Sequence, residues 1–380
     1  HQDLLLCPAH YSKILNPLLF PQHHLYLMMQ YNLSPEKLVH REQVNEDLRD
    51  SFSGMDDVSK VIEKRFDTSL LKRDGLTVTP NIQFFKTDSQ GFLPEILENL
   101  YNQRTASKKK MIEAQKMAEK TKGIEKRRHL NDVSKHSNDQ LARKVQLNSA
   151  YGALGNQYFR FFDVRIAEAV TKAGQLSIRW IEDRMNKYLN KILETENEDY
   201  IVASDTDSIY VTLDRLVDMV LKEDTSNELI VNFIDKVCSE KLEPYIDTCY
   251  SELAEYMNAC DQKMVMKREA IASKGLWTAK KRYVLNVYDN EGVRYTEPKL
   301  KVMGLEAVKS STPEVCRDKI KDALKLIMNG TEEEMLEFIE IFREEFKILP
   351  AEDIAFPRGV NGVKKYMSGN TYIKHTPIHV

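Results

Sequence analysis

Two aspartates one residue apart are the side chains of this 380-residue chain best suited to metal chemistry. Asp205 and Asp207 lie in a short polar stretch between residues 200–203 and 209–213, which are rich in β-branched and aromatic residues. This pattern predicts a hairpin of two strands with both carboxylates near its tip. In extended backbone, positions i and i+2 point to the same side. Paired carboxylates suit Mg²⁺, which prefers oxygen ligands and often shares them with substrate phosphates; an ordinary acidic turn has the same pattern.

A strongly basic segment precedes this pair. Residues 104–144 contain 13 Lys or Arg against 5 Asp or Glu, although the whole chain has a net charge of −3. Arg104 and Lys108 are four residues apart, as are Lys144 and Asn148, so on helices each pair would share a face. The cations therefore suit a phosphate-bearing partner, whereas the ordinary interpretation is a solvated helix surface.

Three separated motifs occur in a fixed order along the chain. Lys144-Val-Gln-Leu-Asn-Ser-Ala-Tyr151-Gly152 is followed by Asp205-Thr-Asp-Ser and then by Lys281-Arg-Tyr283. In this order they resemble motif B, motif C and the Lys-x-Tyr motif of family B DNA polymerases, and three motifs are far more specific than one. The resemblance covers residues 28–380, and the residues in and around the motifs are similar to those of the T-even-type bacteriophage members of the family.

The resemblance implies a role for each of these residues. Arg104, Lys108 and Lys144 would contact the phosphates of an incoming dNTP, while Asn148 and Tyr151 would line the nascent base pair. Asp205 and Asp207 would be catalytic and, with Glu269, would hold two Mg²⁺ ions. The residues implied to contact primer-template DNA are Gly152, Lys281, Tyr283 and Lys309. The ordinary alternatives are core packing for Tyr151 and an ion pair with Arg268 or Lys267 for Glu269.

The resemblance fails at the N-terminus. The family's motif A, Asp-x-x-Ser-Leu-Tyr-Pro, supplies a further metal-binding aspartate, but this chain has no acidic residue between Lys13 and Glu36. Leu25-Tyr26 resembles only its Leu-Tyr, and residues 1–24 read as a wrong reading frame, a misjoined segment or a natural split junction. In the family this tyrosine excludes the ribose 2′-hydroxyl, so the resemblance implies that loss of its motif context disturbs sugar selection.

The expected fold class is α+β, a right-hand polymerase fold with an antiparallel palm sheet and helical fingers. The expected domains are an incomplete N-terminal part of the palm (1–93, with 1–24 aberrant), fingers (94–156), palm with motif C (157–307) and truncated thumb (308–380). Within them the sequence predicts two helices across 94–156, separated at Gly123. Further helices are predicted over about 164–192, 226–258 and 313–347, and a hairpin over 283–295.

Composition is typical of a soluble cytoplasmic protein, in an infected host cell if the chain is phage-encoded. No apolar run of about 18 residues is present, so no membrane segment is expected. The five cysteines include no Cys-x-x-Cys pair and are expected to be reduced thiols. The favoured function is DNA-directed DNA synthesis, with a sliding clamp or a second polymerase chain as further possible partners. The alternatives are a catalytically inactive nucleic-acid-binding fragment or part of a split polymerase, and an RNA-directed or RNA-making palm enzyme.

Overall fold

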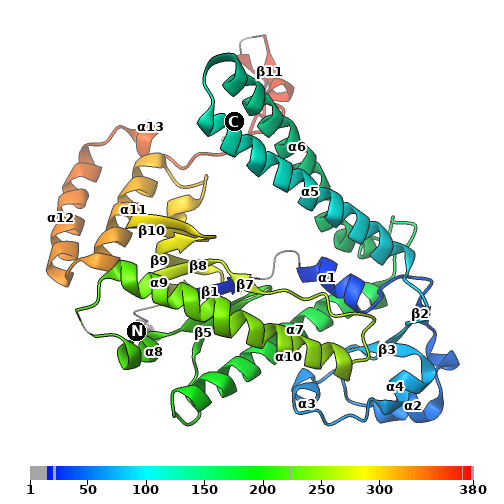
Figure 1. Cartoon of the computed structure of the whole chain (residues 1–380). Coiled ribbons are helices and arrows are strands. Elements are labelled where there is room, and N and C mark those ends of the chain that lie inside the picture. Colours follow the sequence, from blue (N-terminus) through cyan, green and yellow to red (C-terminus); the bar gives the residue numbers. More distant parts are fainter. Residues whose placement is uncertain (1–14, 20–22, 223, 370, 378–380) are drawn as a thin grey trace, which may run out of the picture. The chain divides into compact units, whose positions relative to one another are not determined.

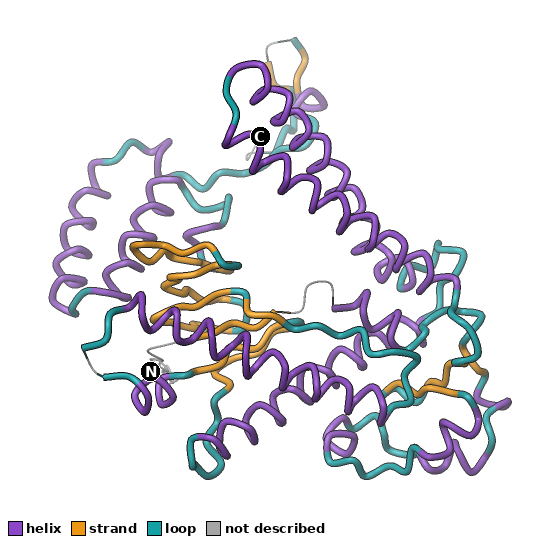
Figure 2. The backbone as a smooth tube through the Cα atoms, viewed as in Figure 1, coloured by secondary structure: helices purple, strands orange, loops and turns teal. Residues whose placement is uncertain are grey.

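The computed structural model describes residues 15–19, 23–222, 224–369 and 371–377 (Figure 1). Most of the aberrant segment 1–24 lies outside these residues. The described residues form two compact units. The larger one lies within residues 17–211 and 215–269, and the smaller one within residues 15–16, 212–214 and 270–377. Both units contain helices and antiparallel strands (Figure 2), which confirms the predicted α+β class.

Two long antiparallel helices stand out in the larger unit. α5 (Phe92–Lys120) and α6 (Gly123–Leu154) pack side by side (Figure 1) and confirm the helices predicted over 94–156. Gly123 adopts φ +64°, a left-handed conformation that glycine enters without a Cβ clash, so the chain reverses there. Among the described side chains of the two helices, the buried apolar ones are Pro94, Leu97, Ala118, Leu147 and Leu154. The helix pair therefore has little core of its own.

A buried helix, α7 (Val164–Ile192), forms the centre of the larger unit, as the apolar stripe over 164–192 predicts. Asp163 caps it by accepting the backbone N–H of Arg165 at 2.9 Å. The indole of Trp180 is fully buried and donates to the carbonyl of Cys249 at 2.9 Å. That carbonyl belongs to α10 (Glu243–Tyr256). α10 follows α9 (Asn227–Val237) and a π-helical turn at Cys238–Leu242, and these three elements together confirm the helix predicted over 226–258.

A small three-stranded antiparallel sheet in the larger unit was missed by the sequence analysis. Its order is β2 (Leu38–Val39), β4 (Gln83–Lys86) and β3 (Leu76–Thr79). Three short helices accompany it, α2 (Glu46–Ser51), α3 (Val58–Ile62) and α4 (Ser69–Asp74). Strands of two to four residues are too short to show a reliable alternation, and this sheet is stabilised by packing, including Phe52 against Phe84 at 5.9 Å between ring centroids.

The predicted acidic hairpin is confirmed. β5 (Ile201–Asp205) and β6 (Ser208–Thr212) are antiparallel, with Asp205 opposite Ser208. β1 (Leu15–Leu19) neighbours β6 in the sheet, and its Leu18 pairs with Arg268 of β7 (Lys267–Arg268). One expectation is wrong: Asp207 lies in the two-residue turn, not in extended backbone, so strand alternation does not orient it. The turn itself sets its direction.

The smaller unit is built on a three-stranded meander of β8 (Ala270–Ala279), β9 (Arg282–Asn290) and β10 (Val293–Met303). The predicted hairpin is therefore confirmed, with longer strands than expected. Val284 of β9 packs with Leu305 and Ala307 and with Leu324 and Met328 of α11 (Glu314–Asn329).

The single helix predicted over 313–347 is wrong, because the structure has two helices there. Gly330 follows α11, and Thr331 starts α12 (Glu332–Ile348) with a capping box: its hydroxyl accepts from the N–H of Glu334, whose carboxylate accepts from the N–H of Thr331. The remaining elements are short: Arg41–Gln43, α8 (Asp214–Val220), Glu306–Val308, α13 (Ala351–Ile354), Val363–Tyr366, β11 (Met367–Ser368) and β12 (Thr371–Tyr372).

Asn32 joins two distant segments of the larger unit. It follows α1 (His23–Gln30), is 1% exposed and adopts φ +52°. Its amide nitrogen donates to the carbonyls of Lys86 and Ser89 at 2.8 and 2.9 Å, and its amide oxygen accepts the N–H of Gly91 at 2.7 Å. Gly91 is the residue before α5. The side chain of Asn32 thus ties the end of α1 to the start of α5.

Asn32→Ala should lower the free energy of unfolding by about 3 kcal/mol, because the buried side chain of Asn32 makes three hydrogen bonds to the backbone and the variant loses all three. Equilibrium urea denaturation measures this loss. Asn197→Ala is the matched control, since Asn197 has a similar φ of +56° but is exposed. Equal losses in the two variants would show that the left-handed backbone, and not the hydrogen bonds, accounts for the effect.

Candidate functional site

The predicted cations and polar residues of α5 and α6 come together on one stretch of the helix pair. Arg143 Nε on α6 donates to Gln103 Oε1 on α5 at 3.2 Å. Arg104 and Lys144 are the next residues along each helix, so they lie at the same level of the helix pair. Lys108, Lys144 and Asn148 are exposed, while Arg104 is half-buried. The Nε atom of Arg104 is buried and has no hydrogen-bond partner in the described structure. This stretch therefore presents positive charge that is open to an anionic ligand.

Two aromatic contacts hold the base of this helix pair against α1. The imidazole of His24 stacks on the ring of Tyr151, with centroids 4.6 Å apart and planes at 19°. Tyr26 donates its hydroxyl hydrogen to the hydroxyl of Tyr101 on α5 at 2.7 Å. Burial, and then the hydrogen bond to Tyr101, raise the pKa of Tyr26 far above its usual value, so it stays a neutral donor. Sequence reasoning missed His24 and Tyr101, because a lone histidine and a helix tyrosine carry no motif.

Gly152 is one turn from Asn148 and is exposed on α6. A Cβ built on Gly152 would meet no atom within 4 Å, so the missing side chain is not required by packing inside the protein. The space over this residue is open to a ligand that approaches the backbone closely.

The acidic hairpin presents one carboxylate at the end of β5 and one in the turn. The carboxylate of Asp205 accepts the backbone N–H of Thr206 at 2.7 Å and its hydroxyl at 3.2 Å. Both Asp205 and Asp207 are partly exposed. The donor set of two carboxylates at a tight turn fits a hard divalent cation such as Mg²⁺.

The third predicted metal ligand, Glu269, directly follows β7 in the larger unit. Its neighbour Arg268 forms an ion pair with Asp235 at 2.8 Å and donates its backbone N–H to Glu243 at 3.0 Å. Within the part of the chain that the structure describes, no three His, Cys, Asp or Glu side chains form a group that could hold a metal ion. The set of Asp205, Asp207 and Glu269 is therefore not assembled as a three-ligand cluster in this structure.

The remaining predicted residues belong to the smaller unit. Lys281 lies in the two-residue turn between β8 and β9 and has φ +62°. Tyr283 is only 8% exposed and packs on Trp277, with ring centroids 5.8 Å apart. Lys309 Nζ forms an ion pair with Glu306 at 3.0 Å. Lys281 thus lies on a turn of the sheet and Lys309 directly after the short helix Glu306–Val308, while Tyr283 is mostly a packing residue.

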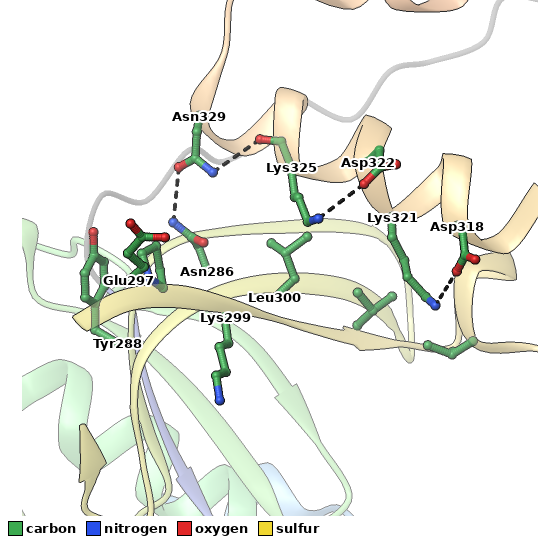
Figure 3. Close-up of a pocket in the computed structure, with 13 residues that line it drawn as sticks. Asn286, Tyr288, Glu297, Lys299, Leu300, Asp318, Lys321, Asp322, Lys325 and Asn329 are labelled. Atoms are coloured by element: carbon green, nitrogen blue, oxygen red, sulfur yellow. Dashed lines mark hydrogen bonds and ion pairs between the residues drawn. The ribbon is translucent and has the colours of Figure 1, made fainter. Parts of the chain in front are cut away.

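A cavity of about 1040 Å³ in the smaller unit lies between the β9–β10 hairpin and α11 (Figure 3). Its helix side is lined by ion pairs three residues apart, Lys321 with Asp318 at 2.9 Å and Lys325 with Asp322 at 3.2 Å. Asn286 reaches across to Asn329 at 3.3 Å. None of the predicted site residues lines this cavity, and the two lysines and two aspartates of its helix side are paired with one another.

The structure bears on two expectations from composition, the absence of a membrane segment and the state of the cysteines. Within the described ranges, every helix falls short of the length or the apolar character that crossing a bilayer requires. The four cysteines in these ranges are free thiols: Cys238, Cys249, Cys260 and Cys316.

Comparisons with known proteins agree with the motifs. The model of DNA polymerase family B matches residues 19–368. The chain is 34% identical to the DNA-directed DNA polymerase of Enterobacteria phage T4, covering 90% of this chain and 42% of that protein. It is 35% identical to the DNA-directed DNA polymerase of Escherichia phage RB69, covering 81% and 39%. An African swine fever virus DNA polymerase beta is 27% identical over 74% of the chain. The chain spans about two fifths of the length of the two phage relatives.

The stack of His24 on Tyr151 should make folding sensitive to pH. Burial lowers the pKa of His24 below its ordinary value of 6.5. As pH falls below 6.5, the unfolded chain binds a proton that folded His24 resists, so the folded state loses stability. His24→Phe, which keeps an aromatic ring, should reduce the loss between pH 7 and pH 5 in urea denaturation. Parallel pH profiles for the variant and the parent would contradict the prediction.

Proposed function

Because the chain belongs to DNA polymerase family B, we propose that it carries the nucleotide-addition machinery of a DNA-directed DNA polymerase. The substrates would be a primer-template duplex and dNTPs, and the product a primer extended at its 3′ end. The observation that carries this proposal is the hairpin of β5 and β6, which presents Asp205 and Asp207 at a tight turn in a chain whose basic helix pair could bind a triphosphate.

The helix pair would bind the incoming nucleotide. Phosphoryl transfer is mainly positioning and charge neutralisation, so exposed cations in fixed positions are what the reaction needs. Arg104 and Lys108 on α5 and Lys144 on α6 would contact the triphosphate. Asn148 and Tyr151 would line the nascent base pair. His24 keeps Tyr151 in place through its stack at 4.6 Å.

Asp205 and Asp207, together with Glu269, would hold two Mg²⁺ ions, which would supply positive charge to the reacting oxygens. The protein's own contribution is to fix the carboxylates. Asp205 is oriented by the N–H and hydroxyl of Thr206, and Asp207 by the short turn. These contacts keep the carboxylates in place before a metal binds.

The proposed division of the chain assigns the fingers to 94–156, the palm to 1–93 and 157–307, and the beginning of the thumb to 308–380, in a right-hand arrangement. Gly152 would let the nascent base pair approach α6 closely. Lys281 and Lys309 would contact the DNA backbone, and Tyr283 would form a rigid wall beneath it. A sliding clamp or a second polymerase chain would be further partners.

Motif A decides whether this chain is active by itself. β1 neighbours β6, the strand that directly follows Asp207. β1 has the sequence Leu-Asn-Pro-Leu-Leu and carries no carboxylate. Without a carboxylate from this strand, Asp205 and Asp207, even with Glu269, leave two dications short of negative ligands. We therefore expect the 380-residue chain to extend a primer negligibly.

Primer extension with dNTPs tests this proposal. A longer version with an in-register Asp-x-x-Ser-Leu-Tyr-Pro before Met28, continued beyond Val380, should synthesise DNA in a Mg²⁺-dependent way. Asp207→Asn should then abolish the activity, because an amide supplies no negative charge to the metals. Asp199→Asn, just before β5, is the control that should retain it. The metal site is misplaced if the 380-residue chain extends primers well, or if the longer version tolerates Asp207→Asn.

A further inference from the structure

The turn that carries Lys281 is strained. Only Lys280 and Lys281 separate β8 from β9, since Ala279 pairs directly with Arg282. Lys281 has φ +62°, in the left-handed region that costs a residue with a Cβ about 1–2 kcal/mol. Such a conformation persists only when surrounding contacts hold it in place.

Gly304 lies directly against this turn. It directly follows β10, whose last residue, Met303, is opposite Tyr283. Gly304 has φ +67°, and a Cβ built on it would lie 2.1 Å from the carbonyl oxygen of Lys281 and 3.3 Å from Cγ of Arg282. A contact of 2.1 Å with backbone cannot be relieved by rotating a side chain. Only glycine therefore allows the chain after β10 to lie against the carbonyl of Lys281.

Glu306 supports the same turn from two residues further on. One oxygen of its carboxylate pairs with Arg282 Nη2 at 2.5 Å, and the other pairs with Lys309 Nζ at 3.0 Å. Arg282 is the first residue of β9, immediately after Lys281. Gly304 and Glu306 thus contact the turn through its backbone and through the neighbouring side chain.

We propose that Gly304 and Glu306 are positioning residues for DNA binding, which hold the Lys280–Lys281 turn so that Lys281 reaches a backbone phosphate of the primer-template duplex. This proposal rests on the proposed function, because it assumes that the duplex binds at Lys281. Neither residue touches the DNA in this account. Their effect reaches the duplex only through the turn.

Gly304→Ala tests the backbone contact, with Gly292→Ala as the matched control. Gly292 also has a left-handed φ, +83°, but a Cβ there would meet nothing within 4 Å. The measurement is the dissociation constant of the 380-residue chain for primer-template DNA across a series of salt concentrations. Gly304→Ala should weaken binding and reduce the slope of log affinity against log salt by about 0.9, the value of one lost phosphate contact. Gly292→Ala should leave both unchanged.

Glu306→Gln tests the same support without adding an atom, which matters if Gly304→Ala does not fold. Removing a negative charge should by itself strengthen binding to DNA. If Glu306 positions the turn, the affinity should fall despite this. A rise in affinity would overturn the positioning role of Glu306.

Lys281→Ala separates failure of the inference from failure of the proposed function. If Lys281→Ala leaves affinity and salt slope unchanged, Lys281 does not contact DNA and the proposed contact fails. If Lys281→Ala reduces the slope but Gly304→Ala behaves like Gly292→Ala, the contact holds and the positioning role of Gly304 is wrong. In the expected case, combining Lys281→Ala with Gly304→Ala gives no further change in slope, because both act on one contact.

Discussion

The positive charge of the α5–α6 helix pair sets the main constraint on this molecule. Cations that bind a triphosphate have to stay exposed and cannot be neutralised by ion pairs within the protein, so the helices need other contacts to fix their position. The structure supplies these at the base of the pair. Tyr26 hydrogen-bonds to Tyr101, and His24 stacks on Tyr151. Asn32 accepts the backbone N–H of Gly91, the residue before α5. All three contacts come from α1 or the residues just after it, and they leave the basic surface open.

A similar arrangement recurs at the two turns to which we assign chemistry. Each turn has only two residues between its strands, Thr206-Asp207 in the larger unit and Lys280-Lys281 in the smaller. A short turn leaves little freedom, so a charged side chain on it is held in place before a ligand binds, and less entropy is lost on binding. At Lys281 the short turn also has a strained, left-handed backbone, against which Gly304 packs closely.

Sequence predicted what depends on local pattern. The long helices and the acidic hairpin followed from hydrophobic periodicity and turn residues, which reflect short-range interactions. The family followed from three motifs in a fixed order. The break between α11 and α12 was missed, although Gly330 and the Thr331 capping box were visible signals. The sheet of β2, β3 and β4 could not be predicted, because strands this short depend on packing partners such as Phe52 and Phe84. The partners of His24 and Gly304 were hidden for the same reason: each lies far away in the sequence.

The central claim is that the exposed cations of the helix pair bind the triphosphate, and single-turnover incorporation of a dNTP tests it most directly. The enzyme would be the longer version with motif A supplied, comparing Lys144→Ala with Lys126→Ala, a change of the same type near the other end of α6. The account predicts that Lys144→Ala lowers incorporation by about tens- to a thousandfold with DNA affinity nearly intact, while Lys126→Ala has little effect. Equal incorporation by both variants and the parent would contradict it and would make Lys144 an ordinary solvated lysine.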